Sequence, residues 1–375
     1  MLLVGIVGKP NAGKSSFFKA ITLLDVKIAD YPFTTIEPNH ATGYVTAECP
    51  CKRLETRCNP RNSQCVNGAR LIPVELLDVA GLVPDAHLGK GMGNQFLDDL
   101  RRASALIHVL DASGTSDENG RKTSGYDPAK DVEWLENEID EWIYGIIKKL
   151  DRTKDIVSAL TKQLTGLGIK EDDIKHAHSK TSDLREMATL IRKISKPILI
   201  AANKMDLPAA KENYESIKRK FSERLVIACC ADYEIALRLA NKAGIIDYFP
   251  GAGQFSIKSS VSLKQKEALE KIKLFLKEYG STGVQPCLNR AVFEFLDYIV
   301  IYPVENENNF SDSKNNILPD AYLVPRGTTA KQFAGHVHTD FEKNFICAID
   351  ARTKMRISSD HELKNGDIIR IVSAK

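Results

Sequence analysis

The sequence predicts an α/β fold: a mostly parallel β-sheet domain that carries an inserted helical subdomain, followed by a small α+β domain. Three observations support this prediction. Apolar runs typical of buried parallel strands recur along the first 230 residues, with helical patterns between several of them. One gap between two runs is about 85 residues long and strongly helical. Beyond residue 299, short strand-like segments bounded by turn residues take over.

Composition excludes several classes of protein. The 375 residues correspond to two or three domains, and 43% hydrophobic with 27% charged residues is typical of a soluble globular chain. The net charge of 52 − 49 = +3 does not demand nucleic acid or acidic lipid as a partner. Apolar runs are shorter than the roughly 20 residues that a membrane helix needs, and residues 1–5 lack a basic leader region. We therefore expect a cytoplasmic protein without membrane association.

The apolar patterns define the expected elements in order. Strands are predicted at 2–7, 71–77, 105–110, 197–202 and 225–228. Helices of the insertion are predicted at 132–147, at 153–166 and from Asp183, and we interpret them as an antiparallel hairpin. Further helices are predicted at 234–243, 262–279 and 286–297, and the last domain combines strands at 321–324, 345–350, 355–357 and 368–372 with a helix at 329–337. This predicts a sheet domain at 1–250 with its insertion at about 120–195, a helical connector at 251–297 and an α+β domain at 298–375.

A phosphate-binding loop follows the first predicted strand. Residues 8–15 read G-x-x-x-x-G-K-S, in which glycines let backbone N–H groups approach a phosphate and Lys14 reaches its oxygens. Ser15 offers a hydroxyl to Mg²⁺, and the helix that begins at Gly13 adds its positive N-terminal end. The candidate phosphate-contacting residues are Gly8, Asn11, Ala12, Gly13, Lys14, Ser15 and Ser16. A glycine-rich turn without a nucleotide is the alternative interpretation.

Two later motifs complete a nucleotide site. Asp78 ends a predicted strand, where it can hold Mg²⁺ through water, and the Gly81 N–H can bond the γ-phosphate. Asn203, Lys204 and Asp206 follow the strand at 197–202. A carboxylate there accepts hydrogen bonds from the guanine N1–H and 2-amino groups, which adenine lacks. Sites built around a specific polar group reject analogues that lack it.

The order of these motifs resembles that of translation-factor-type GTPases. Residues 30–39, 78–84 and 89–97 are similar to the corresponding segments of the Obg/YchF branch. Residues 127–142 resemble the helical insertion of archaeal and eukaryotic YchF-like proteins, and the C-terminal domain resembles a TGS domain, a small ubiquitin-like fold. The resemblance covers nearly the whole chain, and it implies a P-loop NTPase G domain that binds GTP and GDP with Mg²⁺.

The resemblance also assigns individual roles. It implies that Thr35 coordinates Mg²⁺ in the triphosphate state, so that its loop is an ordered/disordered switch. Cys230 and Ala231 stand where the family has a Ser-Ala pair whose backbone contacts the base. YchF proteins that resemble ATP users carry Glu where Asp206 stands here, so we expect this chain to prefer GTP over ATP.

The chain departs from Ras-like enzymes in the residue that activates water. Leu82 stands where those enzymes carry Gln, and an apolar side chain cannot polarise water, so we expect slow intrinsic hydrolysis. Asn11 matches the position that ligates K⁺ in potassium-stimulated relatives, and His87 could orient water. A loop-capping Asn11 and a solvated His87 are the alternatives.

Four of the eight cysteines, at positions 49, 51, 58 and 65, lie close together in the sequence. Cys49, Cys51, Cys58 and Cys65 could hold a tetrahedral Zn²⁺, although their spacing is not that of a zinc ribbon. Small apolar thiols in a long hairpin are the alternative. Residues 49–70 carry five Lys or Arg against one Glu, which could contact RNA phosphates or form a solvated loop.

Three functions are consistent with these features. The first is a GTPase switch whose insertion and TGS-like domain report the nucleotide state to the ribosome, tRNA or rRNA. The second is a nucleotide hydrolase of stress signalling that uses ATP or responds to redox state or metal. The third is an RNA-binding module with a structural nucleotide. We expect a monomer and no DNA partner.

Overall fold

The computed structural model describes residues 2–23, 39–79, 99–150 and 155–374. The chain divides into two compact units. The first comprises residues 1–24, 36–41 and 75–291, and the second comprises residues 25–35, 42–74 and 292–375. No helix in the described ranges is both long and apolar enough to cross a membrane.

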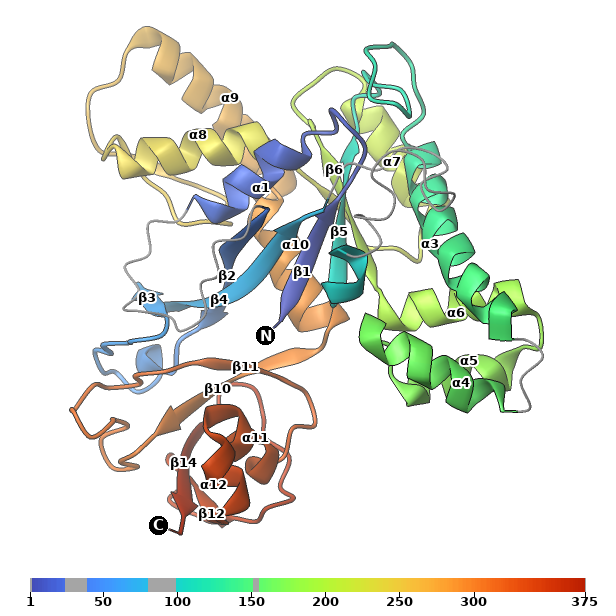
Figure 1. The fold of residues 1–375 in the computed structure, drawn as a ribbon. Helices are drawn as coiled ribbons and strands as arrows, with labels where there is room; N and C mark the ends of the chain where they lie inside the picture. The colour runs from blue at the N-terminus through green and yellow to red at the C-terminus, as the bar shows by residue number, and fades with distance from the viewer. Residues whose placement is uncertain (1, 24–38, 80–98, 151–154, 375) are drawn as a thin grey trace. The chain divides into compact units, whose positions relative to one another are not determined.

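The first unit is built on parallel strands. β1 (Leu3–Val7) pairs with the last residues of β4 (Ala69–Asp78) on one side and with β5 (Ala105–Asp111) on the other. β6 (Ile198–Asn203) and β7 (Val226–Ala228) continue the sheet from β5, again in parallel (Figure 1). β1, β5 and β6 are buried along their whole length, as expected of continuous apolar strands covered on both faces. The prediction of a mostly parallel sheet is confirmed.

Helices cover both faces of this sheet. The helices are α1 (Lys14–Thr22), α3 (Ala129–Leu150), α7 (Ala210–Lys220), α8 (Ala231–Lys242) and α10 (Val284–Arg290). α1 packs against α8 and α10 on one side, and α3 packs against α7 on the other (Figure 1). A two-stranded ribbon of β8 (Ile246–Asp247) and β9 (Ser256–Ile257) precedes α9 (Leu263–Tyr279), which Ser262 caps at its N-terminus.

The described residues of the insertion form four α-helices, whereas the sequence predicted a hairpin with three helices. α3 packs on α6 (Leu184–Ser195), and α4 (Ile156–Leu164) packs on α5 (Glu171–Lys180) after a short 3₁₀ turn at Thr165–Leu167. The sequence pattern missed α5 because this helix buries only Ile174 and Ala177 and is otherwise polar. The structure therefore adds α5 to the three helices that the sequence predicted for the insertion.

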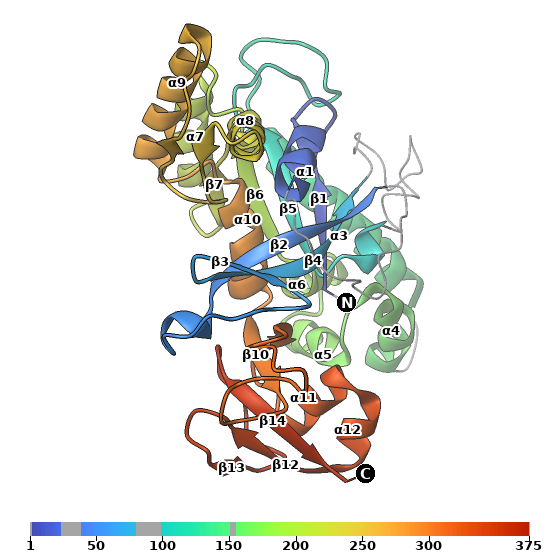
Figure 2. The same ribbon diagram turned by 90° about the vertical axis from the view of Figure 1, so that its left-hand side faces the viewer.

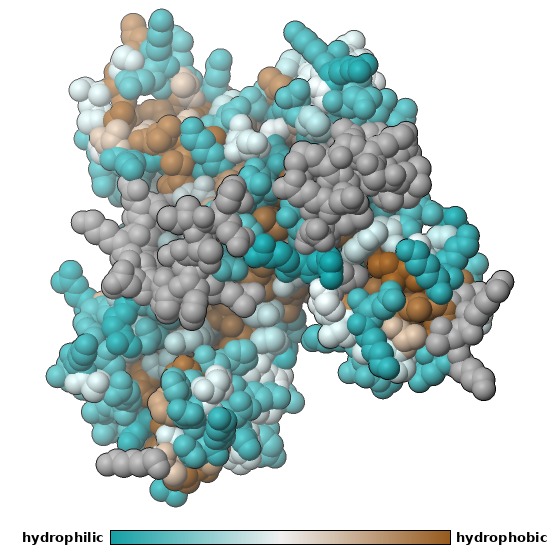
Figure 3. Space-filling model, in the orientation of Figure 1, coloured by the Kyte–Doolittle hydropathy of each residue, from teal (hydrophilic) through white to brown (hydrophobic). Residues whose placement is uncertain are grey.

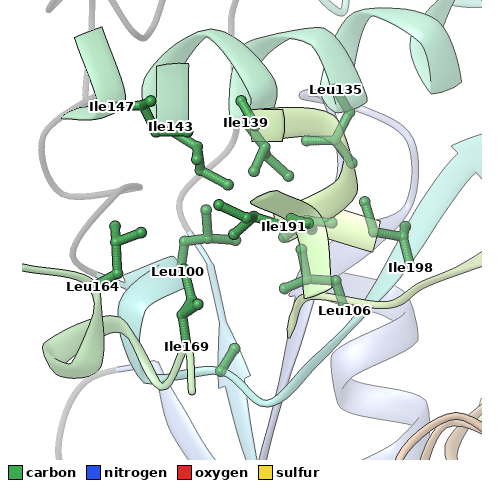
Figure 4. Packing of buried hydrophobic residues seen from close by; sticks show 14 of the residues in the cluster. Leu100, Leu106, Leu135, Ile139, Ile143, Ile147, Leu164, Ile169, Ile191 and Ile198 are labelled. Carbon is green, nitrogen blue, oxygen red and sulfur yellow. The ribbon is translucent and has the colours of Figure 1, made fainter. Parts of the chain in front are cut away.

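One apolar cluster joins the insertion to the sheet. Figure 4 shows Leu135, Ile139 and Ile143 of α3 facing Ile191 of α6, with Leu106 of β5 nearby. All five side chains are fully buried. Apolar side chains also reach the surface over these helices in Figure 3. The insertion is thus held to the sheet of the first unit by a continuous core.

The second unit contains a five-stranded sheet in the order β11-β10-β14-β12-β13. Its strands are β10 (Tyr298–Val304), β11 (Tyr322–Pro325), β12 (Phe345–Asp350), β13 (Arg356–Ile357) and β14 (Ile368–Ser373). α11 (Ala330–Val337) packs on this sheet through Phe333, and the short α12 (Thr339–Lys343) follows it (Figure 2). A π-helical turn at Ala291–Phe295 precedes β10.

The same unit includes a segment from early in the chain. β2 (His40–Glu48) leads through a 3₁₀ turn at Pro50–Lys52 to β3 (Gln64–Val66), which pairs antiparallel with the start of β4. The sequence analysis missed β2 because its residues do not alternate between apolar and polar. It also did not predict β10, which lies directly after a helical region and contains Pro303.

Candidate functional site

The loop between β1 and α1 has the shape that an anion site requires. A Cβ atom on Gly8 would lie 2.6 Å from the Val109 carbonyl oxygen, so the chain has room only for glycine. Gly13 adopts a φ of 88° and faces Asn203, whose Nδ2 would lie 2.3 Å from an added Cβ. Among the described residues no side chain caps α1, and its first turn contains no acidic residue. The first backbone N–H groups of α1 therefore remain available to an anion.

Lys14 and Asp78 form an ion pair at this loop. Both side chains are largely buried, with 13% and 19% of their surface exposed. Asp78 stands at the end of β4 and is the register partner of Ile6 in β1, which fixes it beside the loop. The structure thus brings together the predicted phosphate lysine and the predicted Mg²⁺ carboxylate. Ser15 and Ser16 lie in the first turn of α1.

The Asn203 side chain connects the loop to the start of α8. Its Nδ2 donates to the Ala12 carbonyl oxygen at 3.1 Å, and its Oδ1 accepts from the Ala231 backbone N–H at 3.0 Å. Asn203 is 3% exposed. The sequence placed this residue in a base-binding motif, and the structure gives it a positioning role between two backbone segments.

Asp206 and Cys230 are in contact next to Ala231, which bonds to Asn203. The Cys230 thiol donates to the Asp206 carboxylate at 3.2 Å. Burial, together with the charge of Asp206, raises the pKa of Cys230, so the sulfur keeps its proton and remains a donor. Asp206 itself is exposed, whereas Cys230 and Ala231 are buried. The carboxylate is therefore oriented by a neutral neighbour and stays accessible.

Lys204 contacts the phosphate loop at Asn11. Its φ is 64°, and its Nζ donates to the Asn11 carbonyl oxygen at 2.7 Å and to Asp111 at 2.9 Å. Burial alone would raise the pKa of Asp111, but hydrogen bonds from Ser113, Ser116 and Lys204 lower it. Asp111 is therefore a buried anion with several donors.

Residues that the sequence analysis did not identify also build the site. Lys9 is 2% exposed, forms an ion pair with Asp131 at 2.9 Å and donates to the Ser116 carbonyl oxygen at 2.7 Å. The Asn11 side-chain nitrogen donates to the Gly120 carbonyl oxygen at 2.8 Å. The segment after β5 therefore closes over the phosphate loop. Asp131, which belongs to α3, is itself buried with 2% of its surface exposed.

Four predicted site residues lie outside the described part of the chain. They are Thr35, Gly81, Leu82 and His87. Their assigned roles in Mg²⁺ binding, γ-phosphate contact and water activation remain predictions. The described residues supply the phosphate loop, the Lys14–Asp78 pair and the base-side motif.

The four clustered cysteines are brought together in the second unit. The sulfur atoms of Cys49, Cys51, Cys58 and Cys65 all lie within 4.8 Å of one another. Each is a free thiol, and Cys49 and Cys51 are buried.

Three protein-family models match the chain. Residues 3–162 match a model described as a 50S ribosome-binding GTPase, and residues 201–306 match the G4 motif-containing domain of YGR210-like Obg-like GTPases. Residues 314–373 match the TGS domain. The expected order of a G domain followed by a TGS domain is confirmed.

Individual relatives span the same length. A GTP-binding protein of Methanocaldococcus jannaschii is 51% identical over all of both chains. The ribosome-binding ATPase YchF of Bacillus subtilis is 30% identical, with 92% of this chain and 87% of that protein covered. The crystal structure of a GTP binding protein from Pyrococcus horikoshii OT3 is similar over the full length of both chains, with a TM-score of 0.78 and 39% identity.

The buried amide of Asn203 yields a stability prediction. Asn203→Ala leaves the Ala12 carbonyl and the Ala231 N–H without their partner, so the free energy of unfolding should fall by about 1–3 kcal/mol for each buried group. Denaturant unfolding measures this change. The matched control is Asp206→Ala, which removes an exposed side chain and should change stability by less than about 0.5 kcal/mol. Equal stability of the two variants would contradict the positioning role.

Proposed function

Because the chain belongs to the YchF/Obg-like family of P-loop GTP-binding proteins, we propose that it is a Mg²⁺-dependent GTPase that hydrolyses GTP to GDP and phosphate and acts as a ribosome-associated switch. One observation carries the catalytic part of this proposal. The uncapped start of α1 lies beside the Lys14–Asp78 ion pair, and Asn203 ties the same loop to the Asp206–Cys230 pair. A phosphate subsite and a base subsite are thus parts of one connected structure.

The residues at the phosphate subsite fit a nucleoside triphosphate with Mg²⁺. Backbone N–H groups at the start of α1 and the Lys14 ammonium supply positive donors for phosphate oxygens. The Ser15 hydroxyl and the Asp78 carboxylate are the hard oxygen ligands that Mg²⁺ prefers. When bound, the ion would neutralise charge that develops on the phosphates. Lys14 then exchanges its carboxylate partner for the nucleotide, while Asp78 becomes free to support the metal.

The base subsite fits guanine better than adenine. Asp206 offers an accessible carboxylate that the Cys230 thiol holds in place, and a carboxylate can accept from both the N1–H and the 2-amino group of guanine. Adenine lacks both donors, so its binding would leave the carboxylate without partners. The relatives named ATPases make this choice a proposal specific to this chain.

The base preference can be measured directly. Wild-type protein should bind GTP more tightly than ATP, and Asp206→Ala should weaken GTP binding roughly 10²-fold without weakening ATP binding, because a hydrogen bond to a charged group contributes about 1.5–3 kcal/mol. Isothermal titration with both nucleotides tests this. Asp247→Ala, which removes another exposed carboxylate of the same unit, should leave both affinities unchanged. An ATP affinity equal to or above that for GTP would refute the preference.

We propose that hydrolysis is slow without help and is stimulated by K⁺. The side-chain nitrogen of Asn11 is held by the Gly120 carbonyl oxygen, which fixes the amide at the phosphate loop. A monovalent cation there could supply the electrostatic stabilisation of an arginine finger, which contributes about 10³–10⁵ in rate.

The cation dependence gives a second test. The rate of GTP hydrolysis should be higher in KCl than in NaCl at equal ionic strength, by up to the roughly 10³–10⁵-fold that an arginine finger supplies. Asn11→Gly keeps the backbone φ of 61° accessible but removes the amide, so it should abolish the difference between the salts. Identical wild-type rates in both salts would exclude K⁺ stimulation.

The macromolecular partner is proposed from the family alone. One relative is named a ribosome-binding ATPase, and the first family model is that of a ribosome-binding GTPase. The near-neutral charge means that local surface features, and not a basic surface, must recognise the ribosome.

Sedimentation with ribosomes tests this partner. The protein should pellet with ribosomes when a non-hydrolysable GTP analogue is bound and should dissociate with GDP. Lys14→Ala removes the phosphate lysine, so this variant should lose triphosphate binding, hydrolysis and nucleotide-dependent pelleting, while the TGS domain stays folded. Equal pelleting in the GTP-analogue, GDP and nucleotide-free states would instead indicate an RNA-binding module with a structural nucleotide.

A further inference from the structure

The four sulfur atoms lie at distances that suit one tetrahedral metal ion. Cys49 and Cys58 are 3.9 Å apart at sulfur, Cys51 and Cys65 are 3.7 Å apart, and every other pair lies within 4.8 Å. A tetrahedral zinc site with Zn–S bonds of about 2.3 Å has sulfur–sulfur edges of about 3.8 Å. A disulfide requires about 2.05 Å, so two disulfides would need both pairs to close substantially.

A buried cation beside the thiols lacks an anionic partner among the described residues. Arg70 is fully buried, and Cys65 is its register partner across β3 and β4. Its guanidinium donates to the Ser63 hydroxyl and the Leu318 carbonyl oxygen and lies 5.3 Å from the Tyr302 ring centroid. Its Nε finds no partner within the described ranges. Buried charges are normally paired, which indicates that negative charge belongs in this cluster.

Zinc binding would create that negative charge, because the cysteines that ligate zinc are deprotonated to thiolates. Four thiols that each release a proton and bind one Zn²⁺ leave a net charge of about −2, which the adjacent guanidinium partly offsets. Residues 53–63 contain neither helix nor strand, so the loop lacks an internal hydrogen-bond ladder of its own. A metal ion that binds cysteines at both ends of such a loop gives the stabilisation that a hydrophobic core gives in larger domains.

The loop also binds the C-terminal part of its own unit. Arg61 forms ion pairs with Asp320 at 2.7 Å and with Asp312 at 3.5 Å, and its backbone N–H donates to the Pro319 carbonyl oxygen. Asn59 donates through its backbone N–H to the Ile317 carbonyl oxygen at 3.1 Å. All of these residues belong to the second unit.

We propose that Cys49, Cys51, Cys58 and Cys65 bind one structural Zn²⁺, which holds residues 53–63 in the conformation that binds residues 312–321. The site is separate from the nucleotide machinery, so it stands whether or not the proposed GTPase function is correct. The geometry, the buried Arg70 and the irregular loop support it independently.

Metal analysis of the full-length chain, purified under reducing conditions without chelator, tests the site. We expect one zinc per chain, and Co²⁺ substitution should give the visible bands of tetrahedral thiolate coordination. Cys58→Ser should lower zinc affinity at least about tenfold, whereas Cys347→Ser, a free thiol outside the cluster, should retain one zinc. A metal-free wild-type chain that does not acquire the cobalt spectrum would overturn the proposal, as would two native disulfides in the cluster.

Hydrogen exchange distinguishes a structural zinc from a loosely held one. Chelation should speed exchange at the amides of Asn59 and Arg61, whose acceptors lie in residues 317–319, and should leave the amides of α1 unchanged. Cys65→His retains a zinc ligand and should preserve both the metal and the protection. Unchanged exchange after complete zinc removal would refute the role in loop attachment.

Discussion

The geometry of the site depends on one buried side-chain amide. Asn203 satisfies a carbonyl of the phosphate loop and an N–H at the start of α8, and it lies so close to Gly13 that this position has no space for a Cβ atom. Since both partners are backbone groups, the amide fixes the main chain and not merely another side chain. The phosphate-binding end of α1 and the Asp206–Cys230 pair are thereby placed by the same residue.

β4 contributes residues to both candidate sites, the cysteine cluster and the phosphate loop. Its first residues pair with β3, next to the cysteines, and its last residues pair with β1 and end at Asp78. Arg70 and Asp78 therefore belong to one continuous strand, although they serve a buried thiol cluster and a phosphate site respectively.

Local patterns predicted the elements around the phosphate loop, because an apolar strand, a glycine turn and an amphipathic helix each leave a contiguous signal. The Obg/YchF resemblance added the roles of Thr35, Cys230 and Ala231. The pairing of Lys9 with Asp131 could not be predicted, because 122 positions separate the two residues in the chain. The attachment of Arg61 to Asp320 escaped prediction for the same reason. In addition, the sequence left open whether the basic residues of that loop contact RNA phosphates or solvent, and the structure shows that Arg61 and Arg70 bind within their own unit.

In the described part of the chain, three lysines around the phosphate loop are each paired with an aspartate. Lys9 pairs with Asp131, Lys14 with Asp78 and Lys204 with Asp111. A pocket of unpaired lysines would attract polyanions from a distance, at rates that fall steeply as ionic strength rises. Here the paired charges cancel beyond a few ångströms. These three pairs therefore add little to any long-range attraction of polyanions such as free RNA.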